Sequence, residues 1–151
     1  MTPAHRDTLA LAERFFAAME DQDREAMAEL FAPDATITIP LSLDGSPNPL
    51  GVFRGRREAM SYVDTVLTNF ERTVMLDKTF TVSEDAGTVF IQAKGDLVTR
   101  GTRQPYRNVY VFRIDVRDGR IAAIWEYGNP ITFANLNLAG APASPATATA
   151  E

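Results

Sequence analysis

The chain has 151 residues, carries a net charge of −5, and contains no cysteine and a single histidine, His5. It is long enough for one domain with its own core, and its composition excludes disulfides, thiolate metal sites, cysteine nucleophiles, histidine-based catalytic triads and multi-histidine zinc sites. An acidic chain is also a poor partner for nucleic acid, because such binding depends mainly on neutralising phosphates with lysine and arginine.

The N-terminal segment predicts two helices. Thr2 and Pro3 form an N-cap followed by proline at the first helical position, and apolar residues then recur at helical spacing to about Glu20. A second, shorter apolar stripe follows residues 21–23 and ends at Pro33. Charged side chains within the first helix, and the lack of an apolar run of spanning length, indicate neither a secretory signal nor a membrane anchor. We therefore expect a soluble, cytoplasmic protein.

The middle of the chain predicts a short strand, a loop and a third helix. Residues 36–41 are rich in β-branched side chains, and Asp-Gly-Ser-Pro-Asn-Pro at 44–49 is compatible only with a loop. The segment 40–52 would either cover a pocket as a lid or serve only as a connection, and both interpretations stay open. The helix should run from about Arg56 to Asn69. Its inward apolar residues are Met60, Val63, Val66 and Leu67.

Four strands are expected after the third helix. Their ranges are 71–83, 87–100, 105–117 and 120–128. The last two should form an antiparallel hairpin, because Asp118-Gly119 between them tolerates the positive φ angles of a tight turn. Helices followed by an antiparallel meander predict an α+β fold.

The C-terminal segment predicts one more helical turn and a tail. The turn would be capped by Asn129-Pro130 and would carry Leu136 and Leu138. Residues 139–151 are mostly Ala, Pro, Thr and Ser with almost nothing to bury, so a disordered tail is expected. Since there is no internal repeat and no second boundary, residues 1–138 are predicted to form a single domain.

The last predicted hairpin places one carboxylate in an apolar setting. Glu126 lies among Ile124, Trp125 and Tyr127. A glutamate in this setting loses hydration on folding, which raises its pKa and prepares it for proton transfer if a cavity lies beside it. A glutamate at a strand end can instead cap the next turn or pair with a surface arginine, and both interpretations stay open.

Two further pairs of polar side chains are candidate site residues. Lys94 and Asp96 point to the same face of their strand. On a concave face they would line a pocket, whereas on a convex face they would be an exposed ion pair worth only about 0 to 1 kcal/mol. Asn108 and Tyr110 share a face of the next strand, where they either orient a ligand or satisfy backbone groups within the core.

Several strings of the sequence match one known family over about residues 9–138. The strings are Phe15-Phe16-Ala17-Ala18-Met19, Leu30-Phe31-Ala32-Pro33-Asp34-Ala35, Phe53-Arg54-Gly55-Arg56, Val116-Arg117-Asp118-Gly119-Arg120-Ile121 and Trp125-Glu126-Tyr127. Together they resemble the SnoaL-like branch of the nuclear-transport-factor-2-like (NTF2-like) superfamily, which includes ketosteroid isomerases, polyketide cyclases and limonene epoxide hydrolases. The resemblance implies an NTF2-like cone, in which a curved antiparallel sheet wraps around three helices and encloses a pocket for a small hydrophobic molecule. It also implies a homodimer, and it favours a pocket position for Lys94 and Asp96.

The residues of the ketosteroid-isomerase mechanism are not matched. The catalytic aspartate of those enzymes corresponds to Ile39, and their oxyanion-hole tyrosine corresponds to Phe15. Their second oxyanion donor falls near Tyr110 or Val111, of which only the tyrosine can donate a hydrogen bond. We therefore do not expect steroid isomerisation by that mechanism.

The epoxide-hydrolase pattern is matched in part. The two acids of those enzymes correspond to Asp96 and Glu126, and their bridging arginine corresponds to Lys94. One carboxylate would deprotonate water while the other donates a proton to the epoxide, with the cation separating their pKa values. The side chains that hold the water correspond to Thr36 and Thr38, and lysine in place of arginine loses bidentate geometry.

A third resemblance concerns phenazine-biosynthesis proteins and small pyran-forming cyclases. Their Glu-Tyr-x-Asn-Pro motif is present in full at residues 126–130. In these relatives the glutamate acts as a general acid or base on a bound hydrophobic intermediate. They usually add a histidine in the pocket, which this chain lacks.

The leading hypothesis is a small-molecule enzyme that needs no metal or organic cofactor. It would cyclise or isomerise a hydrophobic intermediate by acid–base chemistry, and an epoxide is one candidate substrate. Glu126 would be the general acid or base, Asp96 its partner, and Lys94 the charge that separates their titrations. The residues expected to bind the substrate are Tyr110, Asn108, Phe16, Phe112 and Tyr127. The alternatives are an epoxide hydrolase that uses Asp96, Lys94 and Glu126, and a non-catalytic module for hydrophobic-ligand binding or dimerisation.

Overall fold

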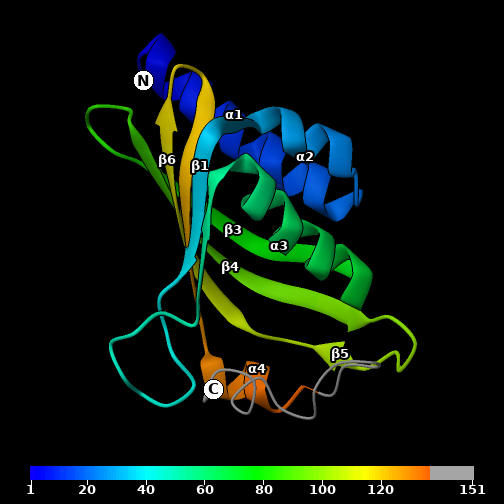
Figure 1. The fold of residues 1–151 in the computed structure, drawn as a ribbon. Coiled ribbons are helices and arrows are strands. Elements are labelled where there is room, and N and C mark those ends of the chain that lie inside the picture. The colour runs from blue at the N-terminus through cyan, green and yellow to red at the C-terminus, as the bar shows by residue number, and fades with distance from the viewer. Residues whose placement is uncertain (137–151) are drawn as a thin grey trace.

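A curved sheet wraps around three helices in the computed structural model, which describes residues 1–136 (Figure 1). The elements are α1 (Pro3–Glu20), α2 (Arg24–Leu30), β1 (Phe31–Ile39), β2 (Gly51–Arg54), α3 (Gly55–Asn69), β3 (Phe70–Val82), β4 (Thr88–Thr99), β5 (Pro105–Tyr106), β6 (Val109–Arg117), β7 (Arg120–Gly128) and α4 (Pro130–Ala134). The α+β cone predicted from the sequence is confirmed. Leu138 and the predicted tail, residues 139–151, lie outside the described residues.

Helix α1 begins at the predicted cap Thr2, and α2 begins at Asp23, which the structure identifies as its cap. Thr2 and Asp23 each accept a hydrogen bond from the backbone N–H three residues later, at 3.2 and 3.1 Å. Helix α2 ends at Leu30 rather than at Pro33, and Phe31 is already extended, with φ −83° and ψ 138°. A residue that precedes proline disfavours the helical region, so the chain leaves the helix before Pro33. The buried Phe31 then starts β1 within the core.

The sequence did not predict β2. This strand pairs antiparallel with β1, from Thr36 opposite Arg54 to Ile39 opposite Gly51. It has only four residues and begins with glycine, so its own β propensity is weak and the pairing with β1 determines its conformation. The segment expected as a loop over residues 40–52 is therefore shortened at its C-terminal end.

The sheet is mixed rather than fully antiparallel. Its strand order is β2-β1-β7-β6-β4-β3, and β5 pairs with β4. The pairs β3–β4, β4–β6 and β6–β7 are antiparallel, as the predicted meander requires, whereas β1 and β7 are parallel. Parallel neighbours need a long connection, and here all elements from β2 to β6 lie between β1 and β7 in the chain. The expectation of an antiparallel sheet is wrong at this one pair.

The concave face of the sheet carries the apolar core. On β4 and β6 the buried side chains alternate with exposed or half-buried ones, as expected for strands with one covered face. Phe16 of α1 packs edge-to-face on Phe112 of β6 and on Phe80 of β3, with ring centroids 5.2 and 6.2 Å apart. Within residues 1–136 no helix is long and apolar enough to cross a membrane. The cytoplasmic location stays a prediction.

Candidate active site

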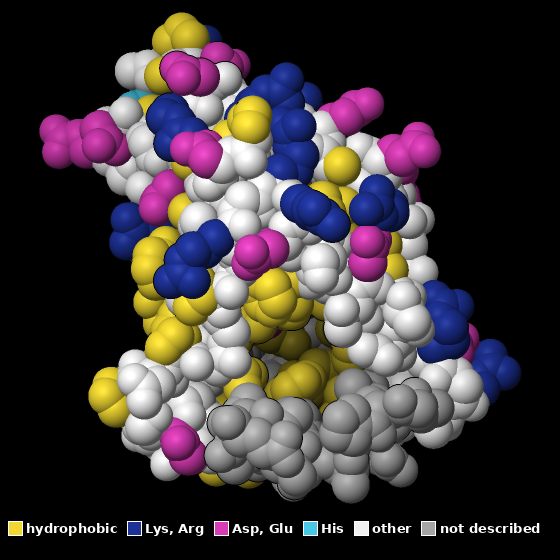
Figure 2. Space-filling model, viewed as in Figure 1, with side chains coloured by type: hydrophobic (Ala, Val, Ile, Leu, Met, Phe, Trp, Pro, Cys, Tyr) yellow, Lys and Arg dark blue, Asp and Glu magenta, His cyan; other side chains and the backbone are white. Residues whose placement is uncertain are grey.

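A cavity of about 360 Å³ lies between the concave face of the sheet and helices α1, α3 and α4. Figure 2 shows a hollow lined by hydrophobic side chains. Small-molecule sites in proteins typically measure about 300 to 1,000 Å³ and combine apolar walls with a few polar groups. Among the described residues, those that line this cavity include no lysine, arginine or histidine, and a single carboxylate, Glu126.

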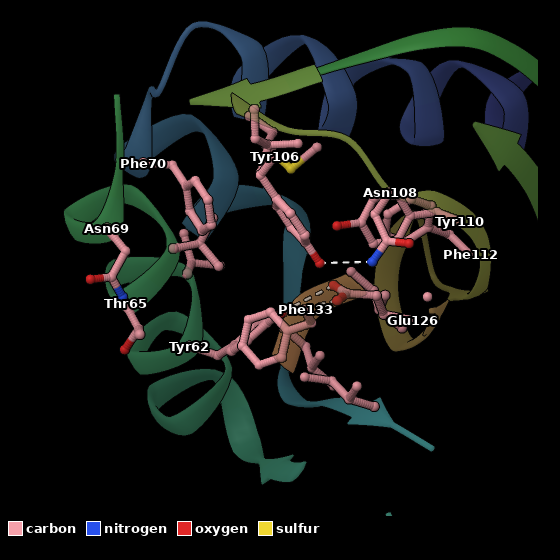
Figure 3. Close-up of a pocket in the computed structure, with 18 of the residues that line it drawn as sticks. Tyr62, Thr65, Asn69, Phe70, Tyr106, Asn108, Tyr110, Phe112, Glu126 and Phe133 are labelled. Carbon is pink, nitrogen blue, oxygen red and sulfur yellow. Dashed lines mark hydrogen bonds between the residues drawn. The ribbon is translucent and has the colours of Figure 1, made fainter. Parts of the chain in front are cut away.

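Glu126 points into the cavity from β7. Ile124 and Glu126 line it, whereas the intervening Trp125 does not, because successive side chains of a strand point to opposite faces. The hydroxyl of Tyr62 on α3 donates to the carboxylate, at 3.1 Å from each oxygen (Figure 3). The Tyr62 ring in turn stacks on Phe53 with centroids 4.8 Å apart. The carboxylate and its donor, 64 residues apart in sequence, are thus held together between helix and sheet.

Burial determines the protonation of Glu126. Loss of hydration raises its pKa from 4.5 to about 7, and the hydrogen bond from Tyr62 opposes part of this rise. Desolvation and the charge of Glu126 together raise the pKa of Tyr62 well above its usual value of 10, so Tyr62 remains a donor. Near neutral pH Glu126 therefore exists in both protonation states, which suits a group that takes up and returns a proton.

Asn108 organises a second set of polar groups between β5 and β6. Its amide nitrogen donates to the Tyr106 hydroxyl at 2.7 Å and to the Asn129 carbonyl at 3.1 Å. Its amide oxygen accepts from the backbone N–H groups of Val109 at 2.8 Å and Asn129 at 3.1 Å. Both donors and both acceptor positions of this amide are used within the protein, so Asn108 positions its neighbours. Asn108 also lines the cavity, and its contact with a substrate stays a prediction.

Tyr110 lines the cavity as predicted, and two glycines make room for its ring. A Cβ atom at Gly95 of β4 would lie 2.7 Å from the ring, and one at Gly128 of β7 would lie 3.0 Å from it. The ring stacks on Phe112, whose centroid is 5.2 Å away. Gly128 occupies the variable position of the Glu-Tyr-x-Asn-Pro motif, so this contact explains why a residue without a side chain stands there.

Lys94 and Asp96 do not face the cavity, contrary to prediction. Asp96 accepts from Arg72 at 2.8 Å and lies 2.9 Å from Arg107, and these arginines lower its pKa, with the Arg72 hydrogen bond as the larger cause. Lys94 lies 3.5 Å from Asp77, and both side chains are largely exposed. Both residues of β4 therefore belong to the convex face and form surface ion pairs.

The signal for this orientation was present in the sequence. The other face of β4 carries Ala93, Gly95 and Leu97, which are buried. A strand with alternating apolar and polar residues turns its apolar side chains toward the core, so Lys94 and Asp96 are expected on the opposite, convex face.

Of the three aromatic residues expected to bind the substrate besides Tyr110, one lines the cavity and two do not. Phe112 lines the cavity. Phe16 is buried behind Phe112 in the core and is not part of the lining, whereas its neighbour Phe15 is. Tyr127 points outward from β7 and is 37% exposed. The predictions for Phe16 and Tyr127 as cavity residues are therefore wrong, since helical and strand geometry turn each away from the cavity.

The residues that correspond to catalytic positions of ketosteroid isomerases line the cavity, whereas those that correspond to the water-binding positions of epoxide hydrolases do not. Ile39 and Phe15, which correspond to catalytic residues of ketosteroid isomerases, line the cavity with apolar side chains. Thr36 and Thr38 are not part of the lining, whereas Ile37 between them is. With Lys94 and Asp96 also outside, the arrangement that epoxide hydrolysis requires is not assembled.

Tyr62 and Tyr106 are site residues that the sequence did not single out. Tyr62 lies in the inward stripe of α3, three residues after Ala59 and four before Val66, and its hydroxyl is the polar group in that stripe. That position could have marked it. No local pattern indicates the contact of Tyr106 with Asn108. Among the described residues, no three acidic or histidine side chains converge closely enough to hold a metal ion.

Comparison with known proteins agrees with this architecture. The model of the SnoaL-like domain family matches residues 12–124. The YesE protein of Bacillus subtilis (strain 168) is 28% identical over 118 residues, which is 78% of each chain. A solved "putative isomerase" from Bacillus subtilis is 25% identical, with a TM-score of 0.74 and coverage of 87% of this chain and 92% of that one.

Two further solved structures share the fold at lower identity. A "putative polyketide cyclase" from Xanthomonas campestris pv. campestris is 19% identical, with a TM-score of 0.74 and coverage of 86% and 96%. A phenazine biosynthesis-related protein from Pseudomonas aeruginosa is 20% identical, with a TM-score of 0.72 and coverage of 86% and 80%. Because the family model spans most of the sequence, the chain belongs to the SnoaL-like domain family.

Proposed function

We propose that this protein is an isomerase or cyclase in which Glu126 transfers a proton on a hydrophobic substrate and no cofactor is required. The observation that carries this proposal is the position of Glu126, a carboxylate of raised pKa held by Tyr62 in a mostly apolar cavity with no other charged side chain among the described residues. The names of two solved structures with this fold, a "putative isomerase" and a "putative polyketide cyclase", support the same class of reaction.

The chemistry follows from the two states of Glu126. The ionised carboxylate takes a proton from a carbon beside a carbonyl group, and the C–H electrons move into a C=C bond while the carbonyl oxygen gains negative charge. The protonated carboxyl then returns the proton to another carbon, which gives isomerisation. In cyclisation the enolate carbon instead bonds to a second carbonyl carbon, the C=O π electrons move to that oxygen, and the oxygen takes the proton back from Glu126. Tyr62 donates to both carboxylate oxygens and so keeps the carboxylate in one orientation. Apolar walls exclude water that would compete for the proton.

The first test detects proton abstraction without knowledge of the natural product. Hydrophobic ketones with acidic α-hydrogens, such as 2-tetralone and 2-indanone, are incubated in D₂O, and loss of the α-hydrogen signal is followed by NMR against a buffer blank. Glu126→Gln should lower the protein-dependent exchange rate at least about 100-fold, the smaller end of the usual effect of a general base.

Asp96→Asn is the matched control, because this carboxylate lies on the convex face and should not alter exchange. Exchange that survives Glu126→Gln at the wild-type rate would contradict the proposed role of Glu126.

A second candidate function is non-catalytic binding of a hydrophobic metabolite. The apolar side chains of Phe15 and Ile39, at positions where ketosteroid isomerases carry reactive groups, favour it. This alternative predicts that the ketones bind, as measured by calorimetry, without any protein-dependent exchange.

We also propose that the protein forms a homodimer through the convex face of the sheet. The exposed apolar side chains of Phe90, Val109 and Tyr127 on β4, β6 and β7 support this proposal, because a second copy would cover them. Light scattering coupled to size exclusion measures the mass directly, and a mass near 16.6 kDa at all concentrations would reject the dimer.

A further inference from the structure

The string Phe53-Arg54-Gly55-Arg56 connects β2, the edge strand of the sheet, to helix α3. Gly55 adopts a φ of +87°, a conformation that favours glycine, at the point where the strand ends and the helix begins. The guanidinium group of Arg56 donates to the carbonyl oxygen of Phe31 at 2.6 and 3.1 Å. The first turn of α3 is therefore fixed against the start of β1, and with it the position of each side chain further along the helix.

Phe53 packs against Tyr62, which lies about two turns into α3. The two rings are stacked, with centroids 4.8 Å apart and 29° between their planes. Gly51, on the same face of β2, leaves room for the Phe53 ring, since a Cβ atom there would lie 3.1 Å from it. The backbone of Phe53 is in turn held opposite Ile37 of β1. The Tyr62 ring is thus covered by a side chain whose strand is anchored in the sheet.

The opposite end of the Tyr62 side chain holds Glu126. Among residues 1–136 the Tyr62 hydroxyl is the only hydrogen-bond donor to this carboxylate, at 3.1 Å from each oxygen (Figure 3). The hydroxyl lies at the far end of the ring, so another rotamer would carry it away from the carboxylate. Phe53 does not line the cavity and so acts on the site only through Tyr62.

We propose that Phe53 is a positioning residue, whose ring keeps the Tyr62 hydroxyl on the carboxylate of Glu126. The consequence for catalysis rests on the proposed function. The contact itself, and its effect on the carboxylate, do not.

The stacked pair should influence the pH at which Glu126 titrates. Burial raises the pKa of Glu126 to about 7, and the hydrogen bond from Tyr62 opposes part of this rise because it stabilises the ionised form. The other titratable groups near the carboxylate are Tyr106 and Tyr110, whose raised pKa values keep both phenols neutral in this range. No lysine, arginine or histidine of the described residues lines the cavity. Loss of the stack should therefore shift the pKa of Glu126 upward.

The test measures this pKa without any substrate. Glutamate labelled with ¹³C at the side-chain carboxyl is incorporated, and the Glu126 signal, identified by its absence in Glu126→Gln, is titrated by NMR. Tyr62→Phe should raise the pKa by about 1 to 2 units, since a hydrogen bond to a charged group is lost. Phe53→Leu keeps an apolar side chain but removes the flat ring, and should raise the pKa by about 0.4 to 1 unit, the most that a stacked aromatic pair can transmit.

Three matched variants separate positioning from a general loss of packing. Phe80→Leu makes the same substitution at a half-buried ring that packs on Phe16, and should leave the pKa of Glu126 unchanged. Phe53→Tyr keeps an aromatic face and should retain the wild-type pKa. Phe53→Leu combined with Tyr62→Phe should add no shift to that of Tyr62→Phe alone, because the hydroxyl through which Phe53 acts is gone. A thermal melt verifies that each variant is folded, and Phe53→Met replaces Phe53→Leu if the latter is not.

Two results would overturn the inference: an unchanged or lowered pKa of Glu126 in Phe53→Leu, or the same shift from Phe53→Leu with and without the Tyr62 hydroxyl. The deuterium-exchange assay separates this inference from the proposed function. If both are correct, the pH midpoint of exchange rises in Phe53→Leu together with the pKa. A shifted pKa without protein-dependent exchange in the wild type would support the positioning role and reject proton transfer, whereas exchange with an unshifted midpoint and pKa would do the reverse.

Discussion

At the scale of single residues, Glu126 should make the stability of the protein depend on pH. Its pKa is about 7 in the folded state against a usual value of 4.5, so the folded protein binds more protons than the unfolded chain between these values, and the free energy of unfolding falls as pH rises from about 4.5 to 7. One pKa unit equals about 1.4 kcal/mol, so the loss amounts to about 3 kcal/mol at most. Glu126→Gln removes this contribution, and urea denaturation should show that the variant gains stability relative to wild type at pH 8 compared with pH 4. Parallel pH profiles for the two proteins would contradict a raised pKa.

At the scale of elements, the close contact between β4, β6 and β7 depends on two glycines that face Tyr110. In Gly95→Ala the new Cβ would lie 2.7 Å from the ring and 3.1 Å from Leu97, and both neighbours are buried. Overpacking of this kind costs about 1 to 3 kcal/mol, which chemical denaturation measures. A double-mutant cycle with Tyr110→Ala identifies the cause: without the ring, Gly95→Ala should cost little, because alanine suits an extended strand better than glycine. The same cost in both backgrounds would show that the ring is not responsible.

At the scale of the whole molecule, the two faces of the sheet differ in what they can bind. The concave face holds the cavity, whereas the convex face carries Val109, which is 63% exposed, together with the ion pair of Lys94 and Asp77. Opposite charges on one surface allow two copies to meet about a twofold axis without net repulsion. Val109→Lys should therefore shift the protein from dimer to monomer in light scattering, while deuterium exchange in the cavity persists. A wild-type mass in this variant would place the interface elsewhere.

Much of the fold could be predicted from local patterns. The caps at Thr2 and Asp23, the hairpin turn at Asp118-Gly119 and the cap at Asn129 each use short-range hydrogen bonds or backbone preferences that a few neighbouring residues determine. The predictions were wrong where residues distant in sequence determine the conformation. Strand β2 depends on its pairing with β1, and β1 pairs in parallel with β7, which lies much later in the chain.

The same division holds in the site. Sequence by itself determined that Glu126 stands in an apolar strand and that Lys94 and Asp96 share one face, because strand periodicity depends only on neighbours. Only the tertiary structure decided which face is concave and that Tyr62, from a helix 64 residues away, meets Glu126. It also decided that Asn108 donates to the Tyr106 hydroxyl and accepts from the backbone of Asn129. The physical reason is that periodicity assigns side chains to faces, whereas burial, desolvation and hydrogen-bond partners depend on what packs against each face.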